Sequence, residues 1–202
     1  MNTIIVEGGK DMGNRIYPIG IQNFEKIRKE GYVYVDKTAL MYKLVKSGSY
    51  FFLSRPRRFG KSLLISTLEA YFEAKRDLFE GLAVETLEKD WVKRPVLHLD
   101  LNIGKYDTPD SLDKILNETL DYWESLYGTR SAETTLALRF AGVVGRAYEQ
   151  SGERVAILID EYDKPLLQAI GNEELQREFR NTLKPFYGVL KTMDGCIKFA
   201  LL

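Results

Sequence analysis

The run RVAILIDEYD, residues 154–163, constrains the fold more than any other stretch of this sequence. Five consecutive apolar residues, Val155 to Ile159, lead directly into the acidic pair Asp160 and Glu161. An unbroken apolar run of this length is typical of a strand covered on both faces, as in a parallel sheet with helices on each side. The run therefore predicts a layered α/β fold in which a central strand ends in carboxylates.

Strand-like and helix-like patterns alternate along the rest of the chain, which favours a mainly parallel sheet flanked by helices in three layers. The final residues fall inside a strand-like pattern, so we expect the sequence to be cut from a longer protein at its C-terminal strand. The predicted strands lie at 32–38, 49–54, 94–102, 155–160 and 196–202, and the predicted helices at 20–31, 36–48, 61–79, 108–128, 131–152 and 172–195.

Composition excludes several classes of function. The 202 residues are 45% apolar, which suits one domain with a substantial core. The 29 basic and 29 acidic residues cancel, so no global field recruits nucleic acid or an anionic membrane. One cysteine, Cys196, and one histidine, His98, cannot build a disulfide framework or a Cys/His zinc cluster. No apolar run is long enough to span a membrane, and we expect a cytoplasmic protein.

A Ser-His-Asp triad would have to use His98. This residue alternates with Leu97 and Leu99 in a strand-like pattern, where a structural histidine is the more common reading.

The stretch FFLSRPRRFGKSLL, residues 51–64, ends its polar part in Gly60-Lys61-Ser62, the close of a phosphate-binding loop. The general pattern G-x-x-x-x-G-K-[ST] has a glycine where this chain has Arg55. A bare G-K-[ST] arises by chance in roughly one chain in ten of this length, so the tripeptide alone is weak evidence. The predicted strand before it and helix after it supply the order that a phosphate loop requires.

The phosphate-loop reading assigns roles by position. Backbone N–H groups of the loop and the start of the helix would hold phosphate, and Lys61 would reach the β- and γ-phosphates of a nucleotide. The Ser62 hydroxyl would bind Mg²⁺, which also needs a carboxylate from the end of a buried strand. The predicted nucleotide-binding residues are Arg57, Arg58, Phe59, Gly60, Lys61, Ser62 and Leu63.

Two carboxylates could complete the magnesium site, Asp100 and Asp160. We favour Asp160 because its strand is more apolar and because Glu161 follows it as a base for an attacking water. The sequence distance fits nucleoside triphosphatases with an additional strand between the loop strand and the metal-binding strand, and we expect the Asp100 strand to be that insert. If Asp100 held the metal, a kinase-like or GTPase-like layout would follow. The plain alternative for Asp160 and Glu161 is an acidic strand end that caps a helix or faces solvent.

Taken together, YVDKT at 34–38, the loop at 51–64, ILIDEYDKPL at 157–166 and the closing KFALL resemble the AAA-ATPase-like domain family, a P-loop ATPase branch related to archaeal-type and STAND-like ATPases. In that family R-P-R-R-F-G-K-S is the usual loop, so Arg55 fits. The resemblance begins near Ile19, which divides the chain into an N-terminal extension, 1–18, and an ATPase-like domain, 19–202.

The resemblance implies ATP and Mg²⁺ as ligands, Lys61 and Glu161 as catalytic residues, and Ser62 and Asp160 as metal ligands. It also implies a C-terminal domain resembling PD-(D/E)XK nucleases beyond this sequence, which ATP hydrolysis would power or regulate. The alternative is a non-hydrolysing nucleotide-gated switch or scaffold, in which bound nucleotide sets the state of a homo-oligomer.

Several roles stay open. The arginines of the loop, Arg55 among them, either contact phosphate or nucleic acid or pair with surface carboxylates. Arg177 and Arg180 would serve as arginine fingers in trans or belong to a solvated helix face. Tyr34, Asp36 and Lys37 lie before the loop, where related ATPases contact adenine, or form a structural corner.

Overall fold

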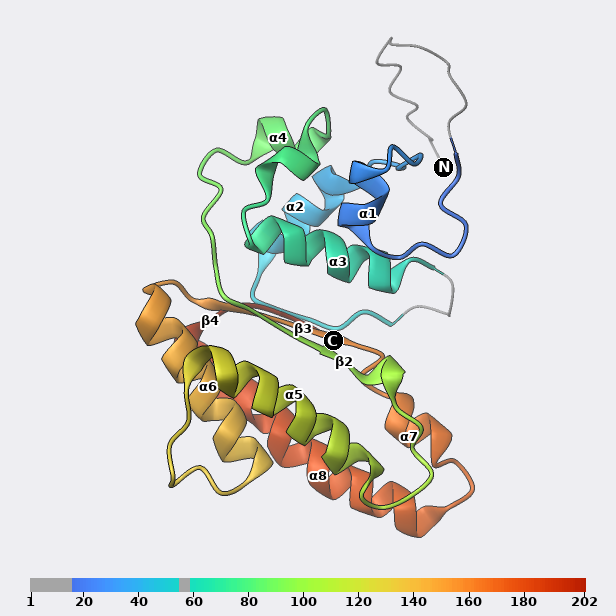
Figure 1. Ribbon diagram of the computed structural model, residues 1–202, viewed down its shortest axis with the longest axis vertical. Helices are drawn as coiled ribbons and strands as arrows, with labels where there is room; N and C mark the ends of the chain where they lie inside the picture. The colour runs from blue at the N-terminus through green and yellow to red at the C-terminus, as the bar shows by residue number, and fades with distance from the viewer. Residues whose placement is uncertain (1–15, 55–58) are drawn as a thin grey trace.

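The computed structural model describes residues 16–54 and 59–202. These residues form an α/β fold with one parallel sheet between two layers of helices (Figure 1). The strands are β1 (Tyr50–Phe51), β2 (Val96–Asp100), β3 (Val155–Asp160) and β4 (Ile197–Leu201). The helices are α1 (Phe24–Lys29), α2 (Thr38–Ser47), α3 (Lys61–Phe72), α4 (Ala83–Leu87), α5 (Ser111–Tyr127), α6 (Leu136–Ser151), α7 (Lys164–Gln168) and α8 (Glu173–Thr192), with 3-10 turns at Arg76–Phe79, Leu101–Ile103 and Asp194–Cys196.

The strand order is β1-β4-β3-β2, and all the pairings are parallel. The predicted mainly parallel sheet is therefore confirmed, but the predicted place of the Asp100 strand is wrong. That strand, β2, lies at the edge of the sheet beside β3, and β4 is the strand that separates β1 from β3. Sequence distance could not show this, because strand order depends on how the crossovers pack rather than on local pattern.

Two apolar cores lie on opposite faces of the sheet. Helices α1 to α4 cover one face, and α5, α6 and α8 cover the other (Figure 1). Strand β3 contributes to both cores, because Ala156 and Leu158 face the first layer while Val155, Ile157 and Ile159 face the second. All five side chains are at most 1% exposed. The strand pattern in the sequence predicted this two-sided burial, and the structure confirms it.

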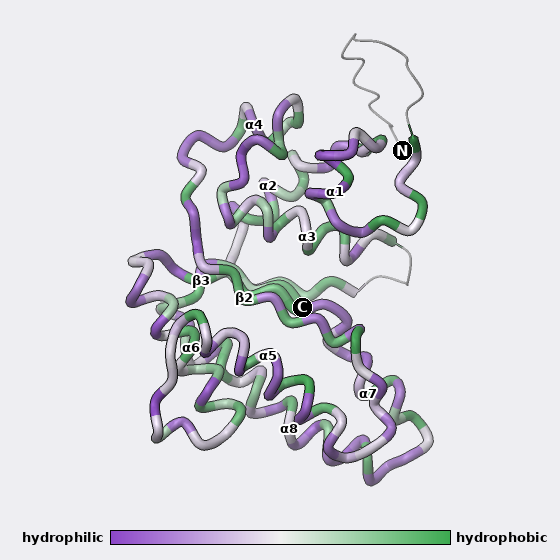
Figure 2. The backbone as a smooth tube through the Cα atoms, in the orientation of Figure 1, coloured by the Kyte–Doolittle hydropathy of each residue, from purple (hydrophilic) through white to green (hydrophobic). Residues whose placement is uncertain are grey.

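Hydropathy along the backbone follows the same layers. The strands form a green, apolar band through the middle of Figure 2, and the surrounding helices mix polar and apolar positions. Alternation of this kind lets each helix bury one stripe against the sheet and expose the other to water. Within the described ranges, no helix combines the length and the apolar character needed to cross a membrane.

Residues 32–38 differ from the predicted strand. Positions 32–37 have no regular secondary structure and pair with no strand of the sheet, and α2 begins at Thr38. Val33 N–H instead donates to the carbonyl oxygen of Ile16 at 3.0 Å, and the Tyr34 ring packs edge-on against Phe24. The alternating pattern thus reflects one side packing on α1 rather than membership of a sheet.

Candidate functional site

The phosphate loop of the sequence lies between β1 and α3, as predicted. Leu53 N–H extends the pairing of β1 with β4 by donating to Leu202 O at 2.6 Å, and the chain then leaves the sheet. Gly60 closes the loop with a left-handed backbone, φ 74°, which glycine adopts without a steric penalty. Helix α3 begins at the next residue, so the N–H groups of its first turn have no partner within the helix. Arg55, Pro56, Arg57 and Arg58 lie outside the described residues.

The acidic pair follows the end of β3. Asp160 is 5% exposed, and its Oδ1 accepts a hydrogen bond from Glu161 N–H at 3.0 Å. Glu161 has φ 51°, a left-handed conformation that is uncommon for a residue with a side chain and is enriched at functional sites. Lys164 N–H donates to Glu161 O at 2.9 Å, and the Tyr187 hydroxyl to Tyr162 O at 3.1 Å. These bonds from α7 and α8 hold the turn in place.

The fold brings the loop lysine and the acidic pair together, although they are about 100 positions apart in the sequence. Lys61 Nζ lies 3.6 Å from Glu161 Oε1, and the two side chains are 16% and 19% exposed. The space enclosed around Lys61, Asp160, Glu161 and Tyr162 is about 10 Å³. That volume is close to the minimum for a single water molecule, so the Lys61–Glu161 pair fills the site.

Asp100, the rival carboxylate, lies beside Asp160 rather than in place of it. The two residues pair in register across β2 and β3, and Asp100 is one strand farther from β1. The Asp100 carboxylate accepts the N–H of Asn102 at 2.7 Å, which caps the 3-10 turn after β2.

His98 has a structural environment. Its Nδ1 lies 3.3 Å from a carboxylate oxygen of Glu69 on α3. Burial alone would lower the pKa of His98, but Glu69 and the carboxylates of Asp100 and Asp160 raise it above its ordinary value. Among the described residues, no serine, threonine or cysteine side chain forms a hydrogen bond with His98, so they contain no Ser-His-Asp triad.

Ser62 and Asp160 suit a magnesium ion by chemistry, because a hydroxyl and a carboxylate are hard oxygen ligands. Asp160 Oδ2 has no hydrogen-bond partner among the described residues, so one oxygen is available for an ion. No group of three His, Cys, Asp or Glu side chains in the described residues could hold a metal by itself. An ion at this site would need phosphate oxygens and water to complete its shell.

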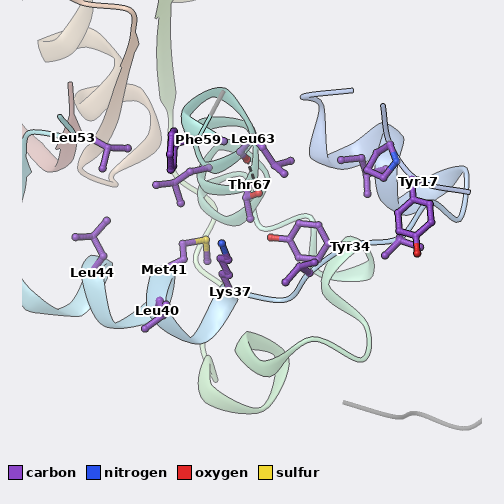
Figure 3. A pocket seen from close by; sticks show the side chains of 16 residues that line it. Tyr17, Tyr34, Lys37, Leu40, Met41, Leu44, Leu53, Phe59, Leu63 and Thr67 are labelled. Carbon is purple, nitrogen blue, oxygen red and sulfur yellow. Dashed lines mark hydrogen bonds between the residues drawn. The ribbon is translucent and has the colours of Figure 1, made fainter. Parts of the chain in front are cut away.

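A larger apolar cavity of about 510 Å³ adjoins the loop (Figure 3). Gly60 and Phe59 of the loop form one side, and Leu63, Leu64 and Thr67 of α3 continue it. The facing wall comes from segments before the loop, and it includes Tyr17, Tyr34, Lys37, Leu40, Met41 and Leu44.

The sequence reading identified Phe59, Gly60 and Leu63 and left Tyr34 and Lys37 open, but it missed the aliphatic wall. Those residues follow the ordinary pattern of a helix that faces the core, so their spacing carried no sign of a cavity. The Leu40 side chain is 64% exposed at this wall, which is the one property that separates it from a core leucine.

Arg177 and Arg180 lie on the exposed face of α8. Arg180 donates to the side-chain oxygen of Gln176, one helical turn earlier, at 3.0 Å. The structure does not bring either arginine to the Lys61–Glu161 site of the same chain.

Comparisons with known proteins agree with this geometry. A family model described as a predicted AAA-ATPase matches residues 18–202. A curated relative, described as an uncharacterized protein in the vnfD 5' region of Azotobacter chroococcum mcd 1, is 40% identical over 193 residues. The match covers 95% of this chain and 37% of that protein, so the chain spans little more than a third of its relative. No solved structure matches.

Proposed function

The chain belongs to the predicted AAA-ATPase family, and on that premise we propose that it binds ATP at the phosphate loop and hydrolyses it with Glu161 as the general base. One observation carries the proposal. Lys61 is the first residue of α3, and Glu161 directly follows the end of β3. Lys61 Nζ and Glu161 Oε1 lie 3.6 Å apart, although nothing in the local sequence requires them to meet. A phosphate loop and an acidic strand end must meet in this way for one set of groups to act on one phosphate.

The residues divide the chemistry as follows. The free N–H groups at the start of α3 and the Lys61 ammonium bind the phosphates and stabilise negative charge that develops during transfer. A bound Mg²⁺ would neutralise phosphate charge, and Ser62 and Asp160 would hold it. Glu161 accepts the proton of the attacking water. The Lys61–Glu161 pair occupies this space, so binding requires Lys61 to turn toward the phosphates and release Glu161.

The apolar cavity next to Gly60 is the proposed position of the adenine base of ATP. Phe59 and Gly60 of the loop line it, and most of its walls are apolar side chains of a kind suited to a flat aromatic ring (Figure 3). Lys37 and Tyr34 are polar groups at the wall that faces α3, where they could orient the base.

The sheet order supports the additional-strand class of P-loop ATPases, because β4 lies between β1 and β3. We further propose that hydrolysis drives a change in a domain attached to this one. The curated relative extends far beyond the matched region, which leaves room for such a domain.

Calorimetric titration with ATP and GTP in the presence of Mg²⁺ tests the binding step. The Lys61→Ala substitution should weaken ATP binding by about tenfold or more, because the charge that meets the phosphates is lost. Lys114→Ala, which removes an exposed lysine paired with Asp110 on α5, is the matched control and should bind as the parent does. Equal affinity of the parent and Lys61→Ala for ATP would remove the loop from its proposed role.

Multiple-turnover phosphate release tests the hydrolysis step. Glu161→Gln keeps the size of the side chain but removes its basicity, so turnover should fall by about 100-fold or more while ATP still binds. Glu174→Gln, at an exposed site in the first turn of α8, should leave turnover unchanged. The alternative function, a switch that does not hydrolyse, predicts instead that parent and Glu161→Gln bind ATP and that neither releases phosphate.

A further inference from the structure

A separate, polar cavity lies at the opposite end of the sheet from the phosphate loop. It has a volume of about 130 Å³ and lies where α2 and α3 end and where β4 begins. Its lining includes Lys46, Glu88, Asp90, Trp91, Arg94 and Lys198, of which Asp90 is exposed. Because β3 and β4 are parallel, the start of β4 lies at the end of the sheet that is remote from Asp160. This cavity is therefore separate from the proposed ATP site.

The one buried carboxylate at this cavity is already fully engaged. Glu88 is 6% exposed, and its Oε1 accepts the backbone N–H groups of Lys89 and Asp90 at 2.9 and 3.1 Å. Its Oε2 accepts the Tyr71 hydroxyl and lies 3.1 Å from Lys46 Nζ. Burial would raise the pKa of Glu88, but these bonds lower it to about 2, so the carboxylate is charged and has no oxygen left for another donor.

A cation at the cavity has no partner. The Lys198 ammonium makes no ion pair with any described residue. Burial and the positive charges of Arg154, Arg94 and Lys46 lower the pKa of Lys198 below its ordinary value.

We infer that this cavity is a binding site for a small tetrahedral oxyanion, phosphate or sulfate, held by Lys198 and Arg94. Both side chains carry positive charge and only donate hydrogen bonds, so they suit a ligand that accepts hydrogen bonds and carries negative charge. The volume far exceeds the roughly 15 Å³ that one water requires. Arg94 can share its guanidinium, because the Glu153 carboxylate, at 2.5 Å, engages only one of its terminal nitrogens.

The two tryptophans of the chain, Trp91 and Trp123, make a direct test possible. Protein labelled with 5-fluorotryptophan gives one ¹⁹F resonance for each, and Trp91→Phe assigns them. Inorganic phosphate is titrated at constant ionic strength into the Lys61→Ala variant, in which phosphate binding at the loop should be weakened. The Trp91 resonance should shift and saturate, while the Trp123 resonance, from the core on the other face, stays in place and reports that the fold is intact.

The Lys198→Met substitution, made in the same Lys61→Ala background, should raise the apparent dissociation constant for phosphate at least about tenfold. Lys184→Met, at an exposed position of α8, is the matched control and should titrate like its parent. Sulfate should reproduce the shift, and chloride at equal ionic strength should not. A Trp91 resonance that phosphate leaves unmoved, or that moves equally in Lys198→Met, overturns the site and leaves water as the occupant. Neither result bears on ATP binding at the loop.

Discussion

At the scale of single residues, the backbone of Glu161 combines strain with chemistry. Its φ of 51° costs of order 1 kcal/mol or more for a residue with a Cβ, and hydrogen bonds to the backbone of residues 161 and 162 maintain it. The turn swings the Glu161 side chain back toward Lys61 instead of onward along the strand. The strained backbone conformation of Glu161 thus positions the side chain of the proposed general base.

A comparison of two substitutions at Glu161 tests this account. At an ordinary position alanine is more stabilising than glycine, but here glycine relieves the left-handed strain. We expect Glu161→Gly to be more stable than Glu161→Ala by about 1 kcal/mol in urea denaturation, with both inactive in phosphate release. Greater stability of the alanine variant would show that the turn is relaxed and that strain has no part in placing Glu161.

Leu40 allows a test of whether the adenine ring of ATP lies in the apolar cavity. The exposed Leu40 side chain lines this cavity, so Leu40→Asp should place a charge against the adenine ring without disturbing the core. ATP affinity should fall about tenfold, while the affinity for tripolyphosphate, which has no base, stays the same. Leu138→Asp, at a 51% exposed leucine on α6, is the control and should change neither affinity. Equal losses for ATP and tripolyphosphate would mean that the cavity does not hold the base.

At the scale of elements, one arginine adds a charged contact to the apolar packing of α5 on α6. Arg139 of α6 grips both carboxylate oxygens of Glu124 on α5 at 2.8 and 2.7 Å, and the two side chains are 16% and 10% exposed. Arg139→Met leaves Glu124 largely buried without its cation, so we expect a loss of about 2 kcal/mol in the free energy of unfolding.

Arg130 offers the contrasting case. It lies 3.9 Å from Glu149, and both side chains are 66% exposed, so Arg130→Met should cost less than about 0.5 kcal/mol. Urea denaturation of the two variants measures the difference. Similar losses in both would show that the grip of Arg139 on Glu124 contributes little to the docking of α5 on α6.

The same scale shows what the sequence could predict. Helices such as α5, α6 and α8 follow strong periodic patterns and the strand β3 is an unbroken apolar run, and the existence and type of these elements were predicted correctly. Segment 32–38 has the alternation of a strand, but its partner is a loop residue, Ile16, and pattern alone does not reveal partners. The edge position of β2 was missed for a related reason, since the order of strands is decided by long-range packing. The Lys61–Glu161 contact was predictable only through the chemistry that phosphate and magnesium demand.

At the scale of the whole molecule, the two cores share β3, and this predicts one cooperative unfolding transition. Trp91 packs against the core formed with α1 to α4, and Trp123 lies in the core formed with α5, α6 and α8. Leu158 faces only the first of these cores, and it is completely buried. A cavity made by Leu158→Ala should cost about 2–5 kcal/mol. Because β3 carries Leu158 and also supports the second core, the loss in the free energy of unfolding should be seen in both cores.

Two single-tryptophan proteins, Trp91→Phe and Trp123→Phe, let fluorescence follow each core separately during urea denaturation. Each should unfold in one transition, and circular dichroism of the same protein should give the same midpoint as fluorescence. Agreement of the two midpoints is the standard sign of two-state behaviour. Adding Leu158→Ala should lower the midpoint equally in both proteins, including the one in which only Trp123, on the far side of the sheet, reports. A shift seen by Trp91 alone would mean that the layers unfold independently and that the sheet does not couple the layer formed by α1 to α4 to the layer on its other face.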